Sequence, residues 1–181
     1  EWSSQWSQRQ TNTRDELRRQ DLQQILTSAA GLGGQSWKAL ETIATLSGSY
    51  LDAYSEDVRA LGQWQEVYGS VRQIQNLLGL ALQSQDSADE LRGIARQLRA
   101  VGEIQGQPVG ERLANHLISL SSEAVAASAG ETYDALAQMI DTGEPSFRFS
   151  ETFQSRARSF AQKYRGTPEG QRVASFLSRV E

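Results

Sequence analysis

The chain has 181 residues, no cysteine, a single histidine and a formal net charge of −4 at pH 7. This length suits one domain, or a bundle with a small appendage, and is enough to bury a core without disulfides or metal ions. The lack of cysteine excludes disulfides, thiolate zinc sites, iron–sulfur clusters and thiol catalysis. The negative charge argues against specific nucleic-acid binding and against strong attraction to anionic lipid.

The spacing of apolar residues predicts an all-α protein. Apolar side chains recur at steps of three and four along the chain, and hardly ever at steps of two. The longest apolar stretch, residues 77–82, is far shorter than the roughly 20 residues that span a bilayer. We therefore expect no transmembrane segment.

A first helix is predicted over residues 13–30, because Thr13 and Glu16 have the spacing of a capping box. Trp2 and Trp6, four residues apart, leave open an earlier start or a mobile arm before it. Its apolar stripe comprises Leu17, Leu22, Ile25, Leu26 and Ala29. The glycine-rich residues 31–34 end it, since glycine readily adopts the left-handed conformation at a helix C-terminus. Residues 1–34 are thus expected to form an N-terminal helical arm.

A second helical region begins near Ser36. From Leu51 to Leu78 the mean spacing of apolar residues is about 3.5, as in a coiled coil. We therefore expect one continuous helix from about Tyr50 to Gln83, although each of its glycines weakens it by about 1 kcal/mol relative to alanine.

Two further helices complete the predicted bundle. Ser87 opens one of them through a second capping box, and that helix ends near Pro108. A long helix then runs over about 110–141, and its middle, residues 124–130, consists almost wholly of small side chains that let another helix approach closely. Residues 35–142 are thus expected to form a bundle of long helices.

The C-terminal part of the chain is predicted to be a separate small piece. The clearest linker covers residues 142–145. Beyond it, Ser150 can cap one short helix, and Thr167 followed by Pro168 can open a second. Residues 143–181 are expected to form a two-helix appendage, so the predicted fold is an elongated bundle of long helices with a small C-terminal helical appendage.

No catalytic, cofactor-binding or metal-binding residue is identified in the sequence, and we expect no enzyme activity. His116 is the one histidine, and a zinc site needs further nitrogen or sulfur ligands. We therefore expect His116 to have a structural role at a helix flank. The glycines of 31–34 lack the preceding strand and the lysine register of a phosphate-binding loop. The acidic group at 86–90 lies at a helix N-terminus, where negative charge is favourable in any case.

The segment that follows Pro145 is rich in arginine and aromatic residues. Its candidate partner-binding residues are Arg148, Phe153, Arg156, Arg158, Phe160 and Tyr164. A basic amphipathic helix with interleaved aromatics can dock a protein partner, a membrane surface or a nucleic acid. In the alternative interpretation, the aromatic rings pack inside the bundle and the arginines form its solvated face.

A second group of candidates is an aromatic stripe at helical spacing, formed by Tyr54, Trp64 and Tyr68 together with Tyr50. Aromatic side chains bury much area per residue and often anchor protein interfaces. Packing inside the chain is the alternative.

The stretch from about Tyr50 to Asp141, with runs such as residues 71–78 (VRQIQNLL), resembles the VirB5/TrbJ family of minor pilus proteins of conjugative type IV secretion systems. The resemblance is one of composition and helical architecture rather than of a specific motif. It implies a non-catalytic, adhesin-like subunit at a pilus tip, in the periplasm or outside the bacterial cell. The glycine interruptions and the basic C-terminal helices do not match the family.

Two other interpretations stay open, a phage virion or ejection component and a cytoplasmic helical adaptor. In each interpretation the expected partners are other protein subunits, and the pilus and virion interpretations place the chain in an oligomeric assembly without cofactors. A periplasmic or extracellular location requires that an export signal preceded Glu1. The sequence begins with Glu1 rather than methionine, and removal of an export signal or a shortened chain explains this equally well.

Overall fold

The computed structural model describes residues 2–34, 36–55, 62–142 and 150–180. Of this part of the chain, 86% is helical, which confirms the all-α class. No β-strand occurs within these ranges, where the only extended pairing is an isolated bridge between Ile104 and Gln107.

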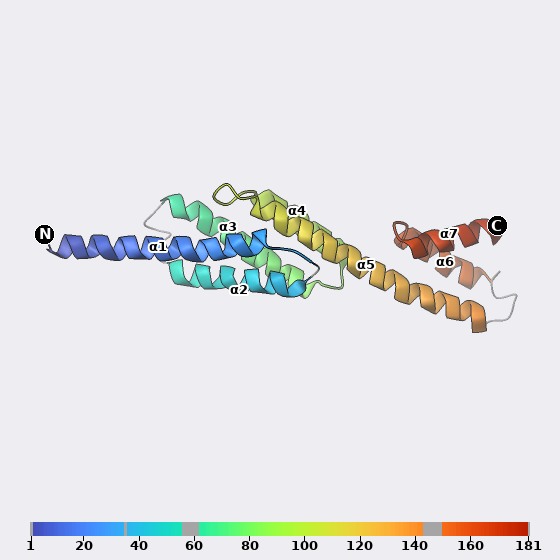
Figure 1. Ribbon diagram of the computed structural model, residues 1–181. Helices are drawn as coiled ribbons and strands as arrows, with labels where there is room; N and C mark the ends of the chain where they lie inside the picture. Colours follow the sequence, from blue (N-terminus) through green and yellow to red (C-terminus); the bar gives the residue numbers. More distant parts are fainter. Residues whose placement is uncertain (1, 35, 56–61, 143–149, 181) are drawn as a thin grey trace. The chain divides into compact units, whose positions relative to one another are not determined.

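Seven helices follow one another over the described ranges (Figure 1). They are α1 (Trp2–Ala30), α2 (Trp37–Tyr54), α3 (Gly62–Gln83), α4 (Ala88–Val101), α5 (Val109–Thr142), α6 (Glu151–Lys163) and α7 (Pro168–Val180). They form two compact units, here called unit 1 (Glu1–Ser121) and unit 2 (Ser122–Glu181).

The two units divide the chain differently from the predicted segments 1–34, 35–142 and 143–181. The C-terminal half of α1 contributes to the core of unit 1, so it is part of the bundle. The second half of α5 contributes to the core of unit 2, together with α6 and α7. The boundary between the units therefore lies within one continuous helix, where no linker composition marks it.

Helix α1 begins at Trp2, before Thr13, which agrees with the earlier start that the spacing of Trp2 and Trp6 left open. Thr13 lies inside the helix, and its hydroxyl donates to the carbonyl of Arg9 at 2.9 Å, so the prediction that Thr13 caps the helix was wrong. The predicted end is confirmed. The backbone N–H of Gly31 donates to the carbonyl of Thr27 at 2.9 Å, and Gly34 has a φ of 77°.

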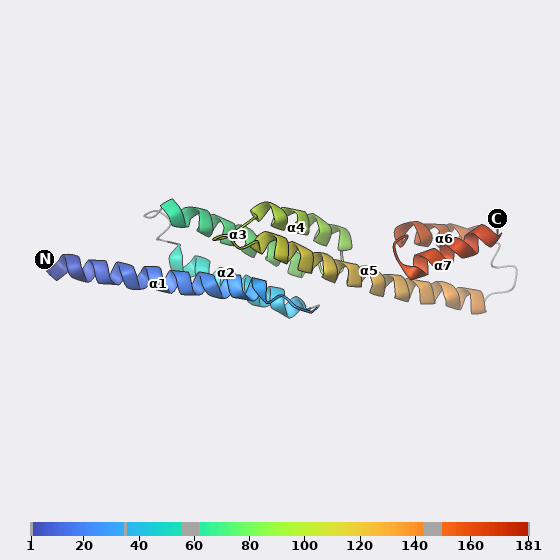
Figure 2. The same cartoon turned by 45° about the horizontal axis from the view of Figure 1, so that its top comes forward.

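The predicted continuous helix from Tyr50 to Gln83 was wrong, because α2 ends at Tyr54 and α3 begins at Gly62. The two helices lie side by side (Figures 1 and 2). The Tyr68 hydroxyl of α3 donates to the carbonyl of Leu51 in α2 at 3.2 Å. Both helices face the same core, so apolar residues keep the same spacing through both of them. The spacing therefore does not show that the chain reverses direction between α2 and α3. Residues 56–61 lie outside the described ranges.

The core of unit 1 draws on all four of its complete helices and on the first turns of α5. Fully buried aliphatic side chains in it are Leu22, Ile25, Leu40, Ile43, Ile74, Leu78, Leu91, Leu98, Leu113 and Leu117. Each such side chain stabilises the folded state by about 1.5–3 kcal/mol relative to leaving it exposed. As predicted, the apolar residues spaced three and four apart form one stripe on each helix, and each stripe faces the core.

Helix α4 ends at Val101, several residues before the predicted end near Pro108. A tight turn follows, in which Ile104 and Gln107 exchange two backbone hydrogen bonds of 3.0 and 3.1 Å. The two central residues, Gln105 and Gly106, have φ values of 50° and 74°. Positive φ at both positions is the signature of a type I′ turn.

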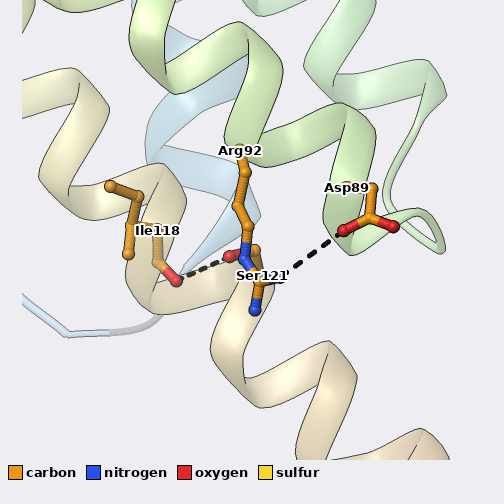
Figure 3. Close-up of polar contacts among 4 residues, drawn as sticks. All are labelled: Asp89, Arg92, Ile118 and Ser121. Atoms are coloured by element: carbon orange, nitrogen blue, oxygen red, sulfur yellow. Dashed lines mark hydrogen bonds and ion pairs between the residues drawn. The ribbon is translucent and has the colours of Figure 1, made fainter. Parts of the chain in front are cut away.

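Polar contacts near the end of unit 1 are shown in Figure 3. Arg92 of α4 forms an exposed ion pair with Asp89, one turn earlier, at 3.4 Å. In α5 the buried Ser121 donates its hydroxyl to the carbonyl of Ile118 at 2.8 Å. Such bonding to the preceding turn satisfies a buried hydroxyl within the helix itself.

In unit 2, both predicted helix caps are confirmed. The Ser150 hydroxyl accepts from the N–H of Phe153 at 3.3 Å, and the Thr167 hydroxyl accepts from the N–H of Gly170 at 3.1 Å. Buried core residues of this unit are Ala129, Leu136, Phe153, Ala157, Phe160, Tyr164, Val173 and Leu177. Of the predicted linker, residues 143–145 lie outside the described part of the chain.

Candidate functional site

The aromatic candidates of the C-terminal segment form the core of unit 2. Phe153, Phe160 and Tyr164 are between 2% and 5% exposed, whereas Arg156 and Arg158 are exposed on α6. The arrangement therefore has aromatic rings inside and arginines on the solvated face. Arg148, the remaining candidate, lies outside the described residues.

A cleft of about 400 Å³ runs between α5 and α6 in unit 2. Its lining residues are Thr132, Ala135 and Leu136 of α5, with Ser155, Arg156, Ser159, Phe160, Lys163 and Tyr164 at α6. Of the two candidate arginines on α6, only Arg156 belongs to this lining. The structure thus separates two arginines that the sequence presented as equivalent, and Lys163 lines the cleft together with Arg156.

Tyr164 closes one end of the cleft and ties α6 to α5. Its hydroxyl lies 2.9 Å from the hydroxyl of Ser128, and the Lys163 ammonium lies 5.2 Å from the centre of its ring. The hydrogen bond with Ser128 lowers the pKa of the Tyr164 phenol, burial opposes this, and Thr132 and Lys163 act in the lowering direction. Hydrogen-bond donors and a cation therefore converge at this end of the cleft.

The chemistry of the cleft is that of a binding surface for an anionic group. Arg156 and Lys163 supply positive charge, the hydroxyls of Ser155 and Ser159 supply donors, and Leu136 with Phe160 supply an apolar floor. None of the described residues that line it is acidic. Charged hydrogen bonds to carboxylates are about twice as strong as neutral ones, so such a surface favours acidic partners.

The aromatic candidates of unit 1 also pack inside. Tyr54 and Trp64 are each 6% exposed, and they enclose the guanidinium of Arg18 at 5.3 and 5.0 Å from their ring centres. The guanidinium also pairs with Asp15 at 3.1 Å. Tyr68 is half-buried and joins α3 to α2 through its hydroxyl. These rings are core residues, which favours the packing alternative for this stripe.

The inward position of Arg18 was not predicted from the sequence. The sequence placed Leu17 on the buried stripe, but Leu17 is 51% exposed and Arg18 is 2% exposed. The signal was present in the spacing, because Arg18 continues the steps of four and three that join Leu22, Ile25 and Ala29. A hydrophobicity pattern misses Arg18 because arginine is a charged residue, although its position continues the buried stripe.

Tyr54 gives unit 1 a pH dependence in alkaline solution. Burial raises the pKa of the Tyr54 phenol, and its hydrogen bond to the carboxylate of Asp21 raises it further. In the unfolded chain this phenol ionises near pH 10, so above that pH the folded state holds its proton more tightly than the unfolded state does. The free energy of unfolding of unit 1 must therefore fall as pH rises above about 10.

We expect Tyr54→Phe to flatten this fall, since phenylalanine has no proton to lose. Urea denaturation at pH 8 to 11, followed by tryptophan fluorescence, measures the effect on unit 1, where all four tryptophans lie. An equal slope in the two proteins would show that Tyr54 ionises alike in both states.

His116 lines a second, polar cleft of about 600 Å³ in unit 1. It is 8% exposed, and its Nε2 atom lies 3.2 Å from the carbonyl of Ser36, the residue before α2. The contact joins α5 to the beginning of α2, as expected for a structural histidine. Among the described residues no group of three or more His, Asp or Glu is placed to hold a metal ion.

The N-terminal turns of α1 are the most exposed helical segment of unit 1. Gln5 and residues 7–14 are all exposed, on every side of the helix. Leu17, at the end of this segment, exposes a large apolar side chain. In Figures 1 and 2 this part of α1 extends past the other helices of unit 1. No described helix has the length and apolarity needed to cross a membrane.

Comparison with protein-family models, with curated proteins and with solved structures finds no match to this chain.

Proposed function

We propose that this chain is a non-catalytic structural protein that binds other protein subunits in an oligomeric assembly, and that the N-terminal turns of α1 are its main binding surface. The observation that carries this proposal is the exposure of Gln5 and residues 7–14 on all sides of a helix.

The exposed N-terminal segment of α1, up to residue 14, receives no packing from unit 1 in the described residues. Isolated helices shorter than about 12–15 residues are marginal in water, and most helical stability in proteins comes from a packed face. Thr11 and Thr13 add little, because each hydroxyl bonds back to its own helix, at Ser7 and Arg9 respectively. A neighbouring subunit lying along these turns supplies the burial that unit 1 does not.

Leu17 provides the apolar anchor for such a contact, and Leu80 provides a matched control. Leu17 and Leu80 are 51% and 52% exposed, and both lie in unit 1, on α1 and α3 respectively. We expect Leu17→Lys to weaken assembly about tenfold or more, which corresponds to about 1.4 kcal/mol. We expect Leu80→Lys to leave assembly unchanged.

The measurement is the fraction of the chain that migrates at high mass when extracts of its own cells are separated by size. Equal fractions for wild type and Leu17→Lys would contradict the proposal. Circular dichroism of each variant shows whether the fold is retained, since neither side chain is buried.

The finer form of the proposal is that the chain is a minor subunit at the tip of a conjugative type IV secretion pilus, located in the periplasm or outside the cell. Its support is the resemblance of residues 50–141 to the VirB5/TrbJ family. Immunogold labelling at pilus tips is the expected result. Labelling confined to the cytoplasm would leave the general assembly proposal standing and remove the finer one.

A further inference from the structure

We propose that the cleft between α5 and α6 in unit 2 is a dimer interface that receives α5 of a second copy of this chain. The inference deepens the proposed function, since it rests on the chain being an assembly protein, but it uses different residues. The cations Arg156 and Lys163 of one copy pair with the acids Glu131 and Asp134 of the other.

The two sides of the cleft are matched to a helix lying lengthwise between them. The lining residues of α6 follow one another at Ser155, Arg156, Ser159, Phe160 and Lys163, which is one continuous face of two turns. The lining residues of α5, Thr132, Ala135 and Leu136, also form one face. Two parallel walls with an apolar floor are the geometry in which a helix binds in a groove.

The side chains along the rim let a helix backbone come close. Ala135, Ser155 and Ser159 are exposed lining residues, and all three are small. On α5, the half-buried Ala124 and the exposed Ser128 come before Ala135. Ala124 and Ser128 are four residues apart, and Ser128 and Ala135 are seven residues apart. Seven-residue spacing keeps a seam facing a partner helix, and small residues in that seam allow short interaxial distances.

The charges on the two copies are complementary. Arg156 and Lys163 lie on the α6 side of the cleft, about 10 Å apart along the helix axis. Glu131 and Asp134 are exposed on α5, on the side turned away from the buried Ala129 and Leu136. The second copy therefore offers an acidic helix face to a cleft whose described lining residues include no acid.

The cations of the cleft and the acids of α5 also lie at matching positions along the α5 axis. Tyr164 contacts Ser128 and Phe160 contacts Tyr133, with a hydroxyl distance of 2.9 Å and a ring separation of 6.4 Å. Lys163 therefore lies near the level of Ser128, and Arg156, on the antiparallel α6, lies about two turns further toward the end of α5. When two α5 helices pack in parallel and in register, Glu131 and Asp134 of one copy fall between those two levels on the other.

The N-terminal turns of α1 fit this cleft poorly. They carry Arg9 and Arg14, which would meet Arg156 and Lys163 with like charge. Like charges placed opposite each other oppose association. The α1 surface and the α5–α6 cleft are thus two separate contacts, and a variant can remove one without the other.

A charge exchange in the full chain tests the dimer. We expect Arg156→Glu with Lys163→Glu to weaken self-association about 100-fold, since two attractive pairs on each side become repulsive. Glu131→Lys with Asp134→Lys should weaken it similarly. The four changes together should restore the dimer, because the opposite charges again face each other. Sedimentation equilibrium measures each dissociation constant.

Arg158→Glu is the matched control, because Arg158 is an exposed arginine on the same helix outside the cleft lining. We expect it to change the dissociation constant less than threefold. A wild-type chain that stays monomeric at high concentration overturns the proposal, whether or not Arg156 and Lys163 then bind an acidic peptide or vesicles of anionic lipid. A four-fold variant that remains monomeric with its helicity intact also overturns it.

The outcome separates this proposal from the assembly proposal. Loss of the dimer through the cleft variants, with assembly through Leu17 unchanged, supports both. An assembly that depends on Leu17, in a chain without any α5–α6 dimer, overturns only the inference drawn from the cleft.

Discussion

Gly170→Ala is expected to destabilise unit 2 by about 3 kcal/mol, which is large for the addition of one methyl group. A Cβ atom at Gly170 would overlap the backbone carbonyl of Tyr164, at the point where α7 begins directly beneath the end of α6. The same carbonyl accepts from the N–H and from the hydroxyl of Thr167, each at 2.9 Å. The chain cannot move away at this point without losing the hydrogen bonds that hold the turn.

Two glycines of the same unit are controls for this prediction. A Cβ atom at Gly166 or at Gly130 meets nothing within 4 Å. Gly130 lies inside α5, where alanine is expected to stabilise the helix by up to about 1 kcal/mol. Hydrogen exchange of the α6 and α7 amides in urea reports on unit 2, which contains no tryptophan. Equal protection in Gly170→Ala and Gly166→Ala would contradict the predicted overlap.

Arg18→Ala is expected to destabilise unit 1 by about 2–4 kcal/mol. The substitution removes a side chain that is 2% exposed, together with its contacts to the rings of Tyr54 and Trp64 and its ion pair with Asp15. A desolvated cation over an aromatic face contributes about 2 kcal/mol, and the cavity that alanine leaves adds to the loss. Tryptophan fluorescence in urea follows the unfolding directly, because Trp64 is part of the cluster.

Arg18→Met distinguishes the charge from the volume. Methionine keeps most of the apolar stem, and replacing a buried charge by an apolar side chain of similar size is often neutral, so we expect a loss below about 1.5 kcal/mol. Arg19→Ala, at the exposed neighbouring position, should change stability by no more than about 0.5 kcal/mol. A loss as large for Arg19→Ala as for Arg18→Ala would remove the special role of the buried guanidinium.

The helix caps of unit 2 and the glycine that ends α1 could be predicted from local sequence, because their chemistry is local. Ser87 precedes α4 as predicted, but its side chain makes no capping hydrogen bond. Ser150 and Thr167 accept the backbone hydrogen bonds that their positions indicated, and Gly31 follows the last residue of α1. The Thr13 capping box failed for a physical reason. A threonine inside a helix bonds to the preceding turn as readily as one at its start, so the pattern alone does not locate the start.

The reversal between α2 and α3 and the boundary within α5 could not be predicted from hydrophobic spacing. Two antiparallel helices that face one core share one apolar period, so the stripe from Tyr50 to Leu78 looks unbroken. The boundary after Ser121 falls inside continuous helix, where composition changes only from large to small side chains. Both features depend on contacts between residues that are distant in the sequence.

The cleft shows how much of a candidate binding surface a charge pattern in the sequence can predict. The sequence presented Arg148, Arg156 and Arg158 as one basic group among aromatic residues. Burial of Phe160 and Tyr164 fixes the rotation of α6, and that rotation alone decides that Arg156 and Lys163 line the cleft while Arg158 does not. No pattern in the sequence singles out Glu131 and Asp134, on which the proposed dimer depends. The structure shows that both are exposed on α5.

We propose that other protein subunits bind along the N-terminal turns of α1. Site-specific photo-crosslinking in the protein's own cells tests it most directly, with the photoreactive residue placed at Gln10 on α1 and, as a control, at Arg96 on α4, which is also exposed. We expect a defined crosslinked subunit at Gln10 and none at Arg96. The same weak, diffuse products at both positions would contradict it.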